Sequence, residues 1–341
     1  MKALYTPAPG EFGLVERPEP ELVPEEVIVR VAAAGLCHTD VIIREGVASH
    51  VIYPVVPGHE VSGVVEECGP GVRHLNPGDR VAIHTIIPCG QCKACRLGLI
   101  PMCDHIDECG SKRDGGLAEY LSVPARCLYP IADHITLQEA AMTEPAANAH
   151  SAVRQARVGP GDKVVVIGPG PIGLLAIQFA KLLHPSVLVL VGTRDERLAL
   201  GEKLGATHTV NIKRLGAEEQ LKEILGSAGA DVVLECAGTR SSFELAMSLG
   251  GMYSRIAIEG VMGVGEMAEI SPHHVLVNGM SIIGILGWLT VDFTRALEYM
   301  ENRLIDVRPL ISHQFSLDQW EEAFTMITQR KSESMKVEIT P

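Results

Sequence analysis

The sequence is poor in aromatic residues and in positive charge. Phenylalanine, tyrosine and tryptophan make up 4% of the 341 residues, and 29 lysines and arginines stand against 42 acidic residues, for a formal net charge of −13. A negative surface repels phosphate backbones, so this balance argues against nucleic acid as a partner. Few aromatic residues with plentiful glycine and valine favour parallel sheets and tight turns over an aromatic-rich binding surface.

The sequence also lacks a long uninterrupted apolar run. Residues 1–5 contain no apolar segment of the kind that a secretory signal carries. Residues 164–180 approach the length of a membrane span, but the run Gly168-Pro169-Gly170-Pro171 interrupts them and leaves a short strand before it and a helix after it. We therefore expect no membrane-spanning segment, no membrane partner and a cytoplasmic protein.

The cysteine content does not suit a disulfide framework. There are nine cysteines, an odd number. Disulfide frameworks are typical of secreted domains, whereas clustered cysteines in a reducing compartment more often bind metal. The clustered cysteines of this chain are therefore candidate metal ligands.

Length and pattern indicate two domains. A chain of 341 residues is too long for one hydrophobic core. The first ~150 residues hold short apolar runs between turn pairs, which is typical of a β-rich domain. Farther along, strands alternate with helices, which implies a parallel sheet with right-handed crossovers and an α/β class. The expected strands are 27–32, 61–66, 80–84, 163–167, 187–191, 231–235 and 255–258, and the expected helices are 172–181, 196–204, 291–302 and 317–329.

Four cysteines lie close together in one loop. The run Cys89-Gly-Gln-Cys92-Lys-Ala-Cys95 is followed shortly by Cys103. Thiolates two residues apart can share one tetrahedral ion, and four of them close its coordination shell, which leaves no position for a substrate. The pattern therefore predicts a structural zinc. Free or redox-active thiols and an iron–sulfur cluster are the alternatives, and nothing else in the sequence indicates electron transfer.

A second, looser set of residues suggests an open metal site. Cys37 follows an expected strand, His59 and Glu60 precede another, and Glu144 lies just before the change of pattern. One cysteine, one histidine and one carboxylate form a mixed shell that leaves room for water or substrate. Each residue alone is more often a core, surface or helix-start residue than a ligand. The prediction of a catalytic metal rests on their conjunction.

A glycine-rich turn follows the apolar run 164–167. Gly168, Gly170 and Gly173 enclose Pro171 and Ile172, and an expected helix begins there. Such glycines allow the tight turn, the close approach of backbone to a pyrophosphate, and tight packing of helix on strand. The glycine pattern alone is weak, but the strand before it and the helix after it strengthen the prediction of a dinucleotide site.

Taken in order, these motifs resemble the zinc-dependent medium-chain alcohol dehydrogenase family. The run Gly58-His59-Glu60-x2-Gly63-x5-Gly69-x2-Val72 looks like its zinc signature, and the cysteine lobe and the glycine turn lie where that family has them. The resemblance covers essentially the whole chain. It implies a GroES-like β-rich catalytic domain over residues 1–150, completed by residues 287–341, and a Rossmann domain with a doubly wound parallel sheet over residues 151–286.

The resemblance also implies a ligand set for the open site. Cys37 and His59 match the catalytic zinc ligands of the family. Glu144 matches the third ligand, which is acidic in the polyol and bacterial secondary-alcohol branches. Glu60 matches a carboxylate that can approach or exchange onto the zinc. Together with the cysteine lobe, this set implies two zinc ions per chain.

Further residues acquire roles in the reaction from the same resemblance. The alcohol oxygen is expected to bind the catalytic zinc, which lowers the pKa of the alcohol. Thr39 would take the alcohol proton, Asp40 would fix the tautomer of His59, and His38 would touch the cofactor pyrophosphate. Many relatives carry a histidine five residues after the ligand cysteine, but that position is Ile42 here. The proton is therefore expected to leave Thr39 through the cofactor ribose and water.

The second strand of the expected dinucleotide domain lacks its usual closing acid. The acid that binds the ribose 2′-hydroxyl in NAD enzymes is expected at Gly192. Its absence removes a charge that would repel a 2′-phosphate, and Thr193 and Arg194 can donate to phosphate oxygens. This run resembles the NADP-using bacterial secondary alcohol dehydrogenases. We therefore favour NADP over NAD, and NAD is the alternative if Arg194 is only a solvated loop residue.

The substrate is the least constrained part of the prediction. The run Glu144-Pro145-Ala-Ala-Asn148 resembles the polyol and threonine dehydrogenase branches, so small secondary alcohols or polyols and their ketones are expected. A primary alcohol is the alternative. A quinone-reductase-like activity without a catalytic zinc is a further alternative. Such members of the fold lack both a ligand of the His59 type and the cysteine lobe, and this chain has both. The family resemblance also implies a homodimer or homotetramer, joined through the edges of the nucleotide-binding sheets.

Overall fold

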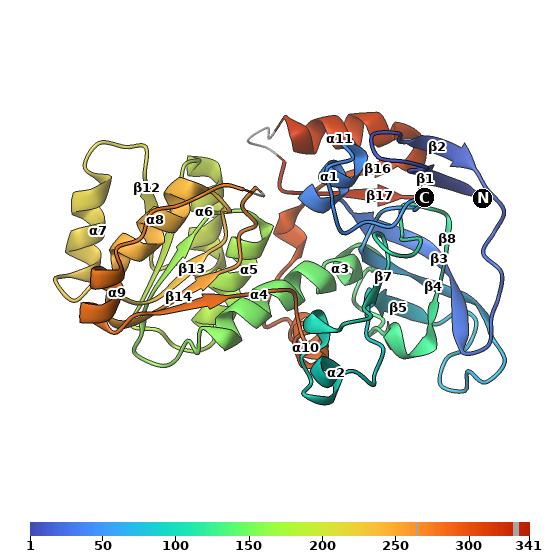
Figure 1. Ribbon diagram of the computed structural model, residues 1–341, viewed down its shortest axis with the longest axis horizontal. Coiled ribbons are helices and arrows are strands. Elements are labelled where there is room, and N and C mark those ends of the chain that lie inside the picture. The colour runs from blue at the N-terminus through green and yellow to red at the C-terminus, as the bar shows by residue number, and fades with distance from the viewer. Residues whose placement is uncertain (264, 330–333) are drawn as a thin grey trace. The chain divides into compact units, whose positions relative to one another are not determined.

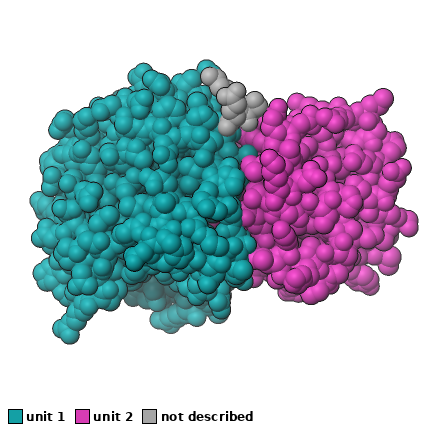
Figure 2. Space-filling model, turned by 180° about the vertical axis from the view of Figure 1, so that it is seen from behind, with its two compact units in different colours: residues 1–144, 289–341 teal, residues 145–288 magenta. Residues whose placement is uncertain are grey.

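The computed structural model describes residues 1–263, 265–329 and 334–341. They fold into two compact units, shown in Figures 1 and 2. The first unit is formed by residues 1–144 and 289–341, and the second by residues 145–288. The C-terminal segment of the chain therefore belongs to the first unit.

The borders between the units lie a few residues from those expected. The sequence prediction set them at 150/151 and 286/287, whereas the division of the structure sets them at 144/145 and 288/289. The first border falls inside helix α4 (Thr143–Gln155), which the sequence pattern did not predict. Glu144 lies in the first turn of this helix.

The first unit is built on a seven-stranded sheet. Its strands follow the order β16-β17-β3-β4-β5-β9, and β8 also pairs with β3. Neighbouring strands are antiparallel except β16 and β17, which are parallel. The strands are β3 (Glu26–Gly35), β4 (Glu60–Cys68), β5 (Arg80–Ile83), β8 (Tyr120–Pro124), β9 (Leu128–Pro130), β16 (Ile311–Ser316) and β17 (Lys336–Thr340). Alternation along β17 buries Val337 and Ile339 in the core of this unit, where Phe324 also lies.

Smaller elements complete the first unit. Two strand pairs lie outside the main sheet, β1 with β2 and β6 with β7. The strands are β1 (Lys2–Tyr5), β2 (Gly13–Glu16), β6 (Ile86–Ile87) and β7 (Asp107–Glu108), the helices are α1 (His38–Arg44), α2 (Lys93–Arg96), α3 (Leu137–Ala141), α10 (Thr290–Glu301) and α11 (Trp320–Thr328), and the 3₁₀ turns are η1 (Ile100–Met102), η2 (Ala125–Cys127), η3 (Arg308–Leu310) and η4 (Leu317–Gln319). Helix α1 begins directly after β3, with Cys37 as its N-cap residue.

The second unit is a six-stranded parallel sheet with helices between its strands. The strand order β12-β11-β10-β13-β14-β15 is that of a doubly wound dinucleotide-binding fold, in which the order reverses beside the first strand. The strands are β10 (Lys163–Ile167), β11 (Val187–Gly192), β12 (His208–Asn211), β13 (Ala230–Glu235), β14 (Gly250–Ile258) and β15 (Ser281–Gly284), and the helices are α5 (Pro171–Lys181), α6 (Asp195–Leu204), α7 (Ala217–Leu225), α8 (Arg240–Leu249) and α9 (Pro272–Asn278).

The structure confirms the predicted fold class. Each expected strand overlaps a strand of the structure, and the expected helix 317–329 begins with η4 before α11. Strands β12, β15, β16 and β17 and helices α7, α8 and α9 were not expected. None of the helices in the described part of the chain is both long and apolar enough to cross a membrane.

Candidate metal centres and cofactor turn

Three side chains that the sequence spaces apart meet at one point of the first unit. The ligand atoms of Cys37, His59 and Glu60 all lie within 4.8 Å of one another. The antiparallel pairing of β3 with β4 brings them together, because Gly35 near the end of β3 lies opposite Glu60 at the start of β4. A thiol, an imidazole and a carboxylate are donors that suit a divalent zinc ion.

Asp40 fixes the backbone on both sides of this group. Its buried carboxylate accepts hydrogen bonds from the backbone N–H of Cys37 at 2.8 Å and of Gly58 at 3.1 Å. The distance from its Oδ1 to His59 Nδ1 is 4.0 Å, which is too long for a direct hydrogen bond. Asp40 therefore positions the residues that carry the ligands, while the sequence prediction gave it a bond to the His59 ring.

The other predicted residues of this region follow on α1. Thr39 lies next to the ligand group, with its Oγ1 at 3.6 Å from Cys37 Sγ. His38 is exposed at the start of the helix, and Ile42 is partly buried one turn farther on. Thr39 is therefore the hydroxyl group on α1 that contacts a ligand side chain.

A buried cation that the sequence did not predict lies beside Glu60. Lys336 Nζ lies 2.5 Å from Glu60 Oε1, and both side chains are almost fully buried. Glu60 Oε2 is also buried and has no hydrogen-bond partner among the described residues. A buried acceptor oxygen without a partner lowers the stability of the fold unless a cation or a hydrogen-bond donor binds it. Glu60 is therefore suited to bind a metal ion here. One signal was present in the sequence, since Lys336 and Glu338 alternate with the core residues of β17.

Glu144 lies buried near this group but does not join its tight set. Burial raises the pKa of Glu144 to about 8, the charge of His59 opposes the shift, and the charge of Glu60 adds to it. Burial lowers the pKa of His59, yet a hydrogen bond and the charge of Cys37, with the charges of Asp40 and Glu144, raise it well above its usual value. So many acidic groups around one imidazole fit a site that holds a cation.

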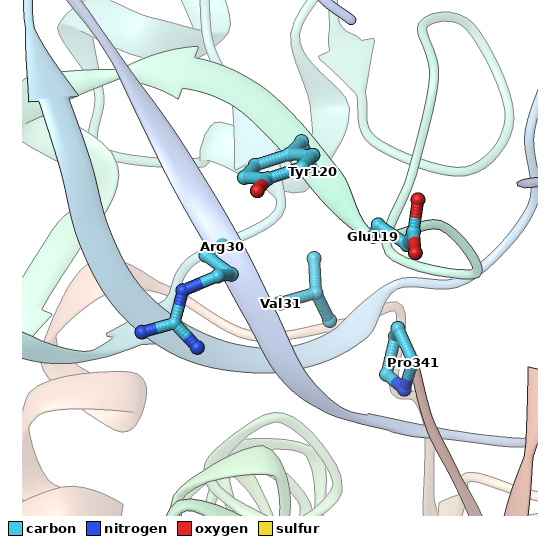
Figure 3. Close-up of a pocket in the computed structure, with 5 residues that line it drawn as sticks. All are labelled: Arg30, Val31, Glu119, Tyr120 and Pro341. Carbon is cyan, nitrogen blue, oxygen red and sulfur yellow. The ribbon is translucent and has the colours of Figure 1, made fainter. Parts of the chain in front are cut away.

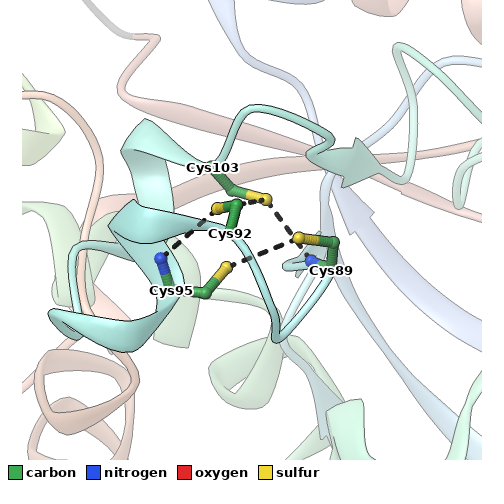
Figure 4. A group of neighbouring side chains, drawn as sticks. All are labelled: Cys89, Cys92, Cys95 and Cys103. Carbon is green, nitrogen blue, oxygen red and sulfur yellow. Dashed lines mark hydrogen bonds between the residues drawn. The ribbon is translucent and has the colours of Figure 1, made fainter.

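The four lobe cysteines gather in a second group, shown in Figure 4. Their sulfur atoms pair at 3.9 Å between Cys89 and Cys95 and at 3.8 Å between Cys92 and Cys103. Backbone N–H groups point at them, from Cys89 to Cys103 Sγ at 3.3 Å and from Cys95 to Cys92 Sγ at 3.5 Å. Backbone hydrogen bonds from Cys95 and Asp104 lower the pKa of Cys92 to about 6. Thiolates held in this way fit a closed zinc site.

The glycine turn of the second unit lies where the strand order reverses. Gly168 follows β10 with a φ of +108°, and a Cβ there would lie 2.9 Å from the backbone nitrogen of Ala237. Pro171 and Ile172 open α5 after the N-cap Gly170. A Cβ on Gly173 would lie 1.9 Å from the carbonyl oxygen of Gly168, so only glycine allows this close packing of helix on turn. The helix start is thereby free to face a pyrophosphate.

The end of β11 carries the residues predicted to select the cofactor. Gly192 is buried at the end of the strand, Thr193 is exposed and Arg194 is partly buried. A Cβ at position 192 would lie 2.5 Å from Pro169 Cγ, so a larger residue there would have to displace the Pro169 ring. The adjacent Asp195 is occupied by Arg214 at 2.8 Å.

A second arginine lies close to Arg194. Burial and the charge of Arg194 lower the pKa of Arg197 to about 10. Two guanidinium groups at the start of one helix suit a bound dianion. Arg197 was not among the expected residues, although a residue in the first turn of a helix lies near its N-cap.

A further hollow of about 130 Å³ lies elsewhere on the first unit, lined by Arg30, Val31, Glu119, Tyr120 and Pro341 (Figure 3). Two of its charged side chains already form hydrogen bonds, since Arg30 bonds Glu66 at 3.2 Å and Glu119 accepts from the backbone of Lys2 at 2.7 Å.

Two protein families match the chain. Residues 23–133 match the alcohol dehydrogenase GroES-like domain, and residues 171–302 match the zinc-binding dehydrogenase family. The first match contains the segments with Cys37, His59, Glu60 and the cysteine lobe, and the second begins inside the glycine turn.

Known proteins match over the full length. A sorbitol dehydrogenase from Halalkalibacterium halodurans is 32% identical and covers 100% of this chain and 99% of its own length. An L-threonine 3-dehydrogenase from Anaeromyxobacter sp. is 32% identical and covers 99% and 98%. A solved structure described as a zinc-binding dehydrogenase from Sinorhizobium meliloti bound to NADP is similar with a TM-score of 0.92, at 31% identity, over 100% of this chain and 99% of that one.

Proposed function

The chain belongs to the zinc-dependent medium-chain alcohol dehydrogenase family, and from this membership we propose that it moves hydride reversibly between a secondary alcohol or polyol and a nicotinamide dinucleotide. The observation that carries the proposal is the meeting of Cys37, His59 and Glu60 in a chain that also builds the glycine turn of a doubly wound sheet. The sorbitol and threonine dehydrogenase relatives support a substrate whose reacting carbon bears a hydroxyl group.

The catalytic centre is assigned to the group formed by Cys37, His59 and Glu60, near which Glu144 lies. Cys37, His59 and Glu144 would hold a zinc ion, with Glu60 able to approach or join them. A zinc ion there supplies the Lewis acidity that lowers the pKa of an alcohol hydroxyl. Lys336 holds Glu60 Oε1 by an ion pair at 2.5 Å and so sets how far that carboxylate can move.

Thr39 is assigned the transfer of the alcohol proton. Its Oγ1 lies beside Cys37 Sγ and can accept the proton while the Thr39 hydroxyl passes its own proton on. Ile42 on the same helix has no group that takes up a proton, so the onward route is water and the cofactor ribose. Asp40 acts through its hydrogen bonds to the backbone of Cys37 and Gly58, and His38 is assigned a contact with the cofactor pyrophosphate.

A second zinc is assigned to the cysteine lobe, which gives two per chain. Cys89, Cys92, Cys95 and Cys103 supply all four positions of a tetrahedral shell, so this ion would stabilise the loop without meeting substrate. None of the nine cysteines of the described residues takes part in a disulfide bond. This state supports the reducing cytoplasm as the place of the protein.

NADP is assigned as the preferred hydride carrier. Gly192 brings no carboxylate to the end of β11, and Asp195 is neutralised by Arg214. Arg194 and Arg197 then provide two positive charges for a 2′-phosphate, and Thr193 a hydroxyl donor. The bound NADP described for the Sinorhizobium meliloti protein is in line with this assignment.

A homodimer through the edge of the parallel sheet is the smallest assembly that we propose. Strand β15 is an edge strand, and its Ile282 is 41% exposed. Nearby along the chain Leu276, Val277 and Leu286 are 77%, 57% and 58% exposed. An open edge with apolar side chains is a template for pairing with a second copy, and two such dimers would form a homotetramer.

The test is an alcohol panel assayed with both cofactors. Secondary alcohols, polyols and threonine are incubated with NADP or NAD, and reduced nicotinamide is followed by its absorbance. Oxidation of secondary alcohols or polyols with a higher kcat/KM for NADP supports the proposal. No nicotinamide reduction with any alcohol contradicts the activity, whereas a higher kcat/KM with NAD contradicts only the cofactor assignment.

A further inference from the structure

One carboxylate near the catalytic group has no role in the scheme above. Glu108 is the last residue of β7, is partly buried, and pairs across the strands with Ile86. It forms no salt bridge in the part of the chain that the structure describes. Its charge adds to the raised pKa of Glu144, after burial and the charge of Glu60.

The segment that carries Glu108 is joined to the catalytic group by hydrogen bonds. Cys109 donates from its backbone N–H to the carbonyl of Thr85 at 3.0 Å, and the Thr85 hydroxyl donates to the carbonyl of His59 at 3.0 Å. A Cβ on Gly110 would lie 2.9 Å from the carbonyl oxygen of Gly58, so this segment also packs directly on the residue before His59. Glu108 is thus held at a fixed place relative to His59.

The same segment is tied to the chain that follows α1. The carbonyl of Ser111 accepts a hydrogen bond from the backbone N–H of Ile52 at 2.8 Å. Residues 107–111 therefore connect the strand that begins with Glu60 to the segment after the helix that carries Thr39.

Ser111 orients the Glu108 carboxylate by bonding one of its two oxygens, and the other oxygen remains available as an acceptor. The buried Ser111 hydroxyl donates to Glu108 Oε2 at 2.6 Å. The other oxygen, Oε1, accepts no hydrogen bond from the described residues and is not enclosed. An ionised carboxylate only accepts hydrogen bonds, so a group that binds Glu108 Oε1 must be a hydrogen-bond donor.

We propose that Glu108, oriented by Ser111, is a specificity-determining residue that accepts a hydrogen bond from a second donor on the alcohol substrate. The inference rests on the proposed alcohol dehydrogenase function. The donor is a further hydroxyl or an ammonium group, as sorbitol and threonine carry besides the reacting hydroxyl. A site built to bond a polar substrate group rejects the analogue that lacks it, because its own polar group then stays unpaired.

The test compares three matched alcohols, which are 2-butanol, 2,3-butanediol and 3-amino-2-butanol. The quantity measured is kcat/KM with the holoenzyme and NADP, for wild type, Glu108→Gln and Glu108→Ala. The wild type is expected to prefer the diol or the amino alcohol over 2-butanol by about ten- to a hundredfold, the range for a hydrogen bond to a charged group. Glu108→Ala is expected to bring this ratio close to one.

Glu108→Gln separates the two donors and guards against misfolding. The amide oxygen still accepts from Ser111, and the amide NH2, which takes the place of Oε1, can donate to a hydroxyl but not to an ammonium group. The preference for the diol should therefore largely remain, whereas a preference for the amino alcohol should be lost. Glu67→Ala is the matched control, because Glu67 is an exposed carboxylate at the far end of β4. It should leave both ratios as in wild type.

Two results would overturn the inference. One is a wild-type enzyme that oxidises 2-butanol as efficiently as both bifunctional alcohols. The other is a Glu108→Ala enzyme that keeps the wild-type ratios. If no alcohol is oxidised with NADP or NAD, the proposed function itself fails, and the assignment of Glu108 fails with it.

Discussion

The buried pair of Lys336 and Glu60 gives the sharpest prediction. Lys336→Met removes the ammonium that lies 2.5 Å from Glu60 Oε1. Because Glu60 Oε2 already has no partner among the described residues, both carboxylate oxygens would then be buried without a protein donor. Breaking a buried ion pair on one side costs about 3–5 kcal/mol. At about 2–4 °C per kcal/mol for a unit of this size, the melting temperature should fall by roughly 6–20 °C.

The measurement is thermal and urea unfolding of wild type and five variants, one of which is the single variant Glu60→Gln that the comparison with the double variant needs. Lys336→Arg keeps the charge and should retain most of the stability. The double variant Glu60→Gln with Lys336→Met removes both charges. Its loss of unfolding free energy should be smaller than the sum of the losses in the two single variants. Lys2→Met is the control, since the Lys2–Asp318 pair at 2.8 Å lies at the surface and should contribute little. A Lys336→Met protein as stable as Lys2→Met would refute the reasoning, and so would additivity in the double variant.

The remaining predictions concern single steps of the account. Thr39→Val should lower kcat about 10²–10⁴-fold with zinc content unchanged and Thr39→Ser should recover activity, whereas a fully active Thr39→Val would rule out this proton acceptor. Arg194→Ala with Arg197→Ala should lower kcat/KM for NADP about ten- to a hundredfold and leave NAD nearly unaffected, and an equal loss with both cofactors would contradict the phosphate contact. Cys103→Ser should lower the melting temperature and the zinc content by one ion per chain, as metal analysis would show. Ile282→Lys should shift the mass by light scattering from dimer to monomer, and an unchanged mass would exclude pairing through β15.

The fold was largely predictable because its signals are local. The β-branched run of β10, the glycines that follow it and the apolar face of α5 lie within one short stretch, so the sequence alone predicts a dinucleotide fold. Strand β15 escaped prediction because three of its four residues are exposed at an edge and it carries no clear alternation. The shift of the first border arises from α4, which begins with Thr143 and continues through the place where the pattern changes.

The site was predictable where spacing encodes chemistry. The cysteines of the lobe gather as their spacing predicts, and Cys37 and His59 meet beside the paired ends of β3 and β4, while their roles as zinc ligands stay predictions. Lys336 could not be assigned to Glu60, because 276 positions separate them and only the packing of β17 beside β3 brings them together. The contacts of Asp40 to the backbone of Cys37 and Gly58 likewise depend on the folded turn and not on residue type.

Zinc content per chain tests the central claim most directly. The purified protein and a His59→Ala variant are analysed for zinc by mass spectrometry against protein concentration. The account predicts two zinc ions per chain in the wild type, and one in the variant, because the cysteine lobe keeps its ion when the catalytic group loses a ligand. A wild type with one ion or none, or a His59→Ala protein that still holds two, would contradict the account.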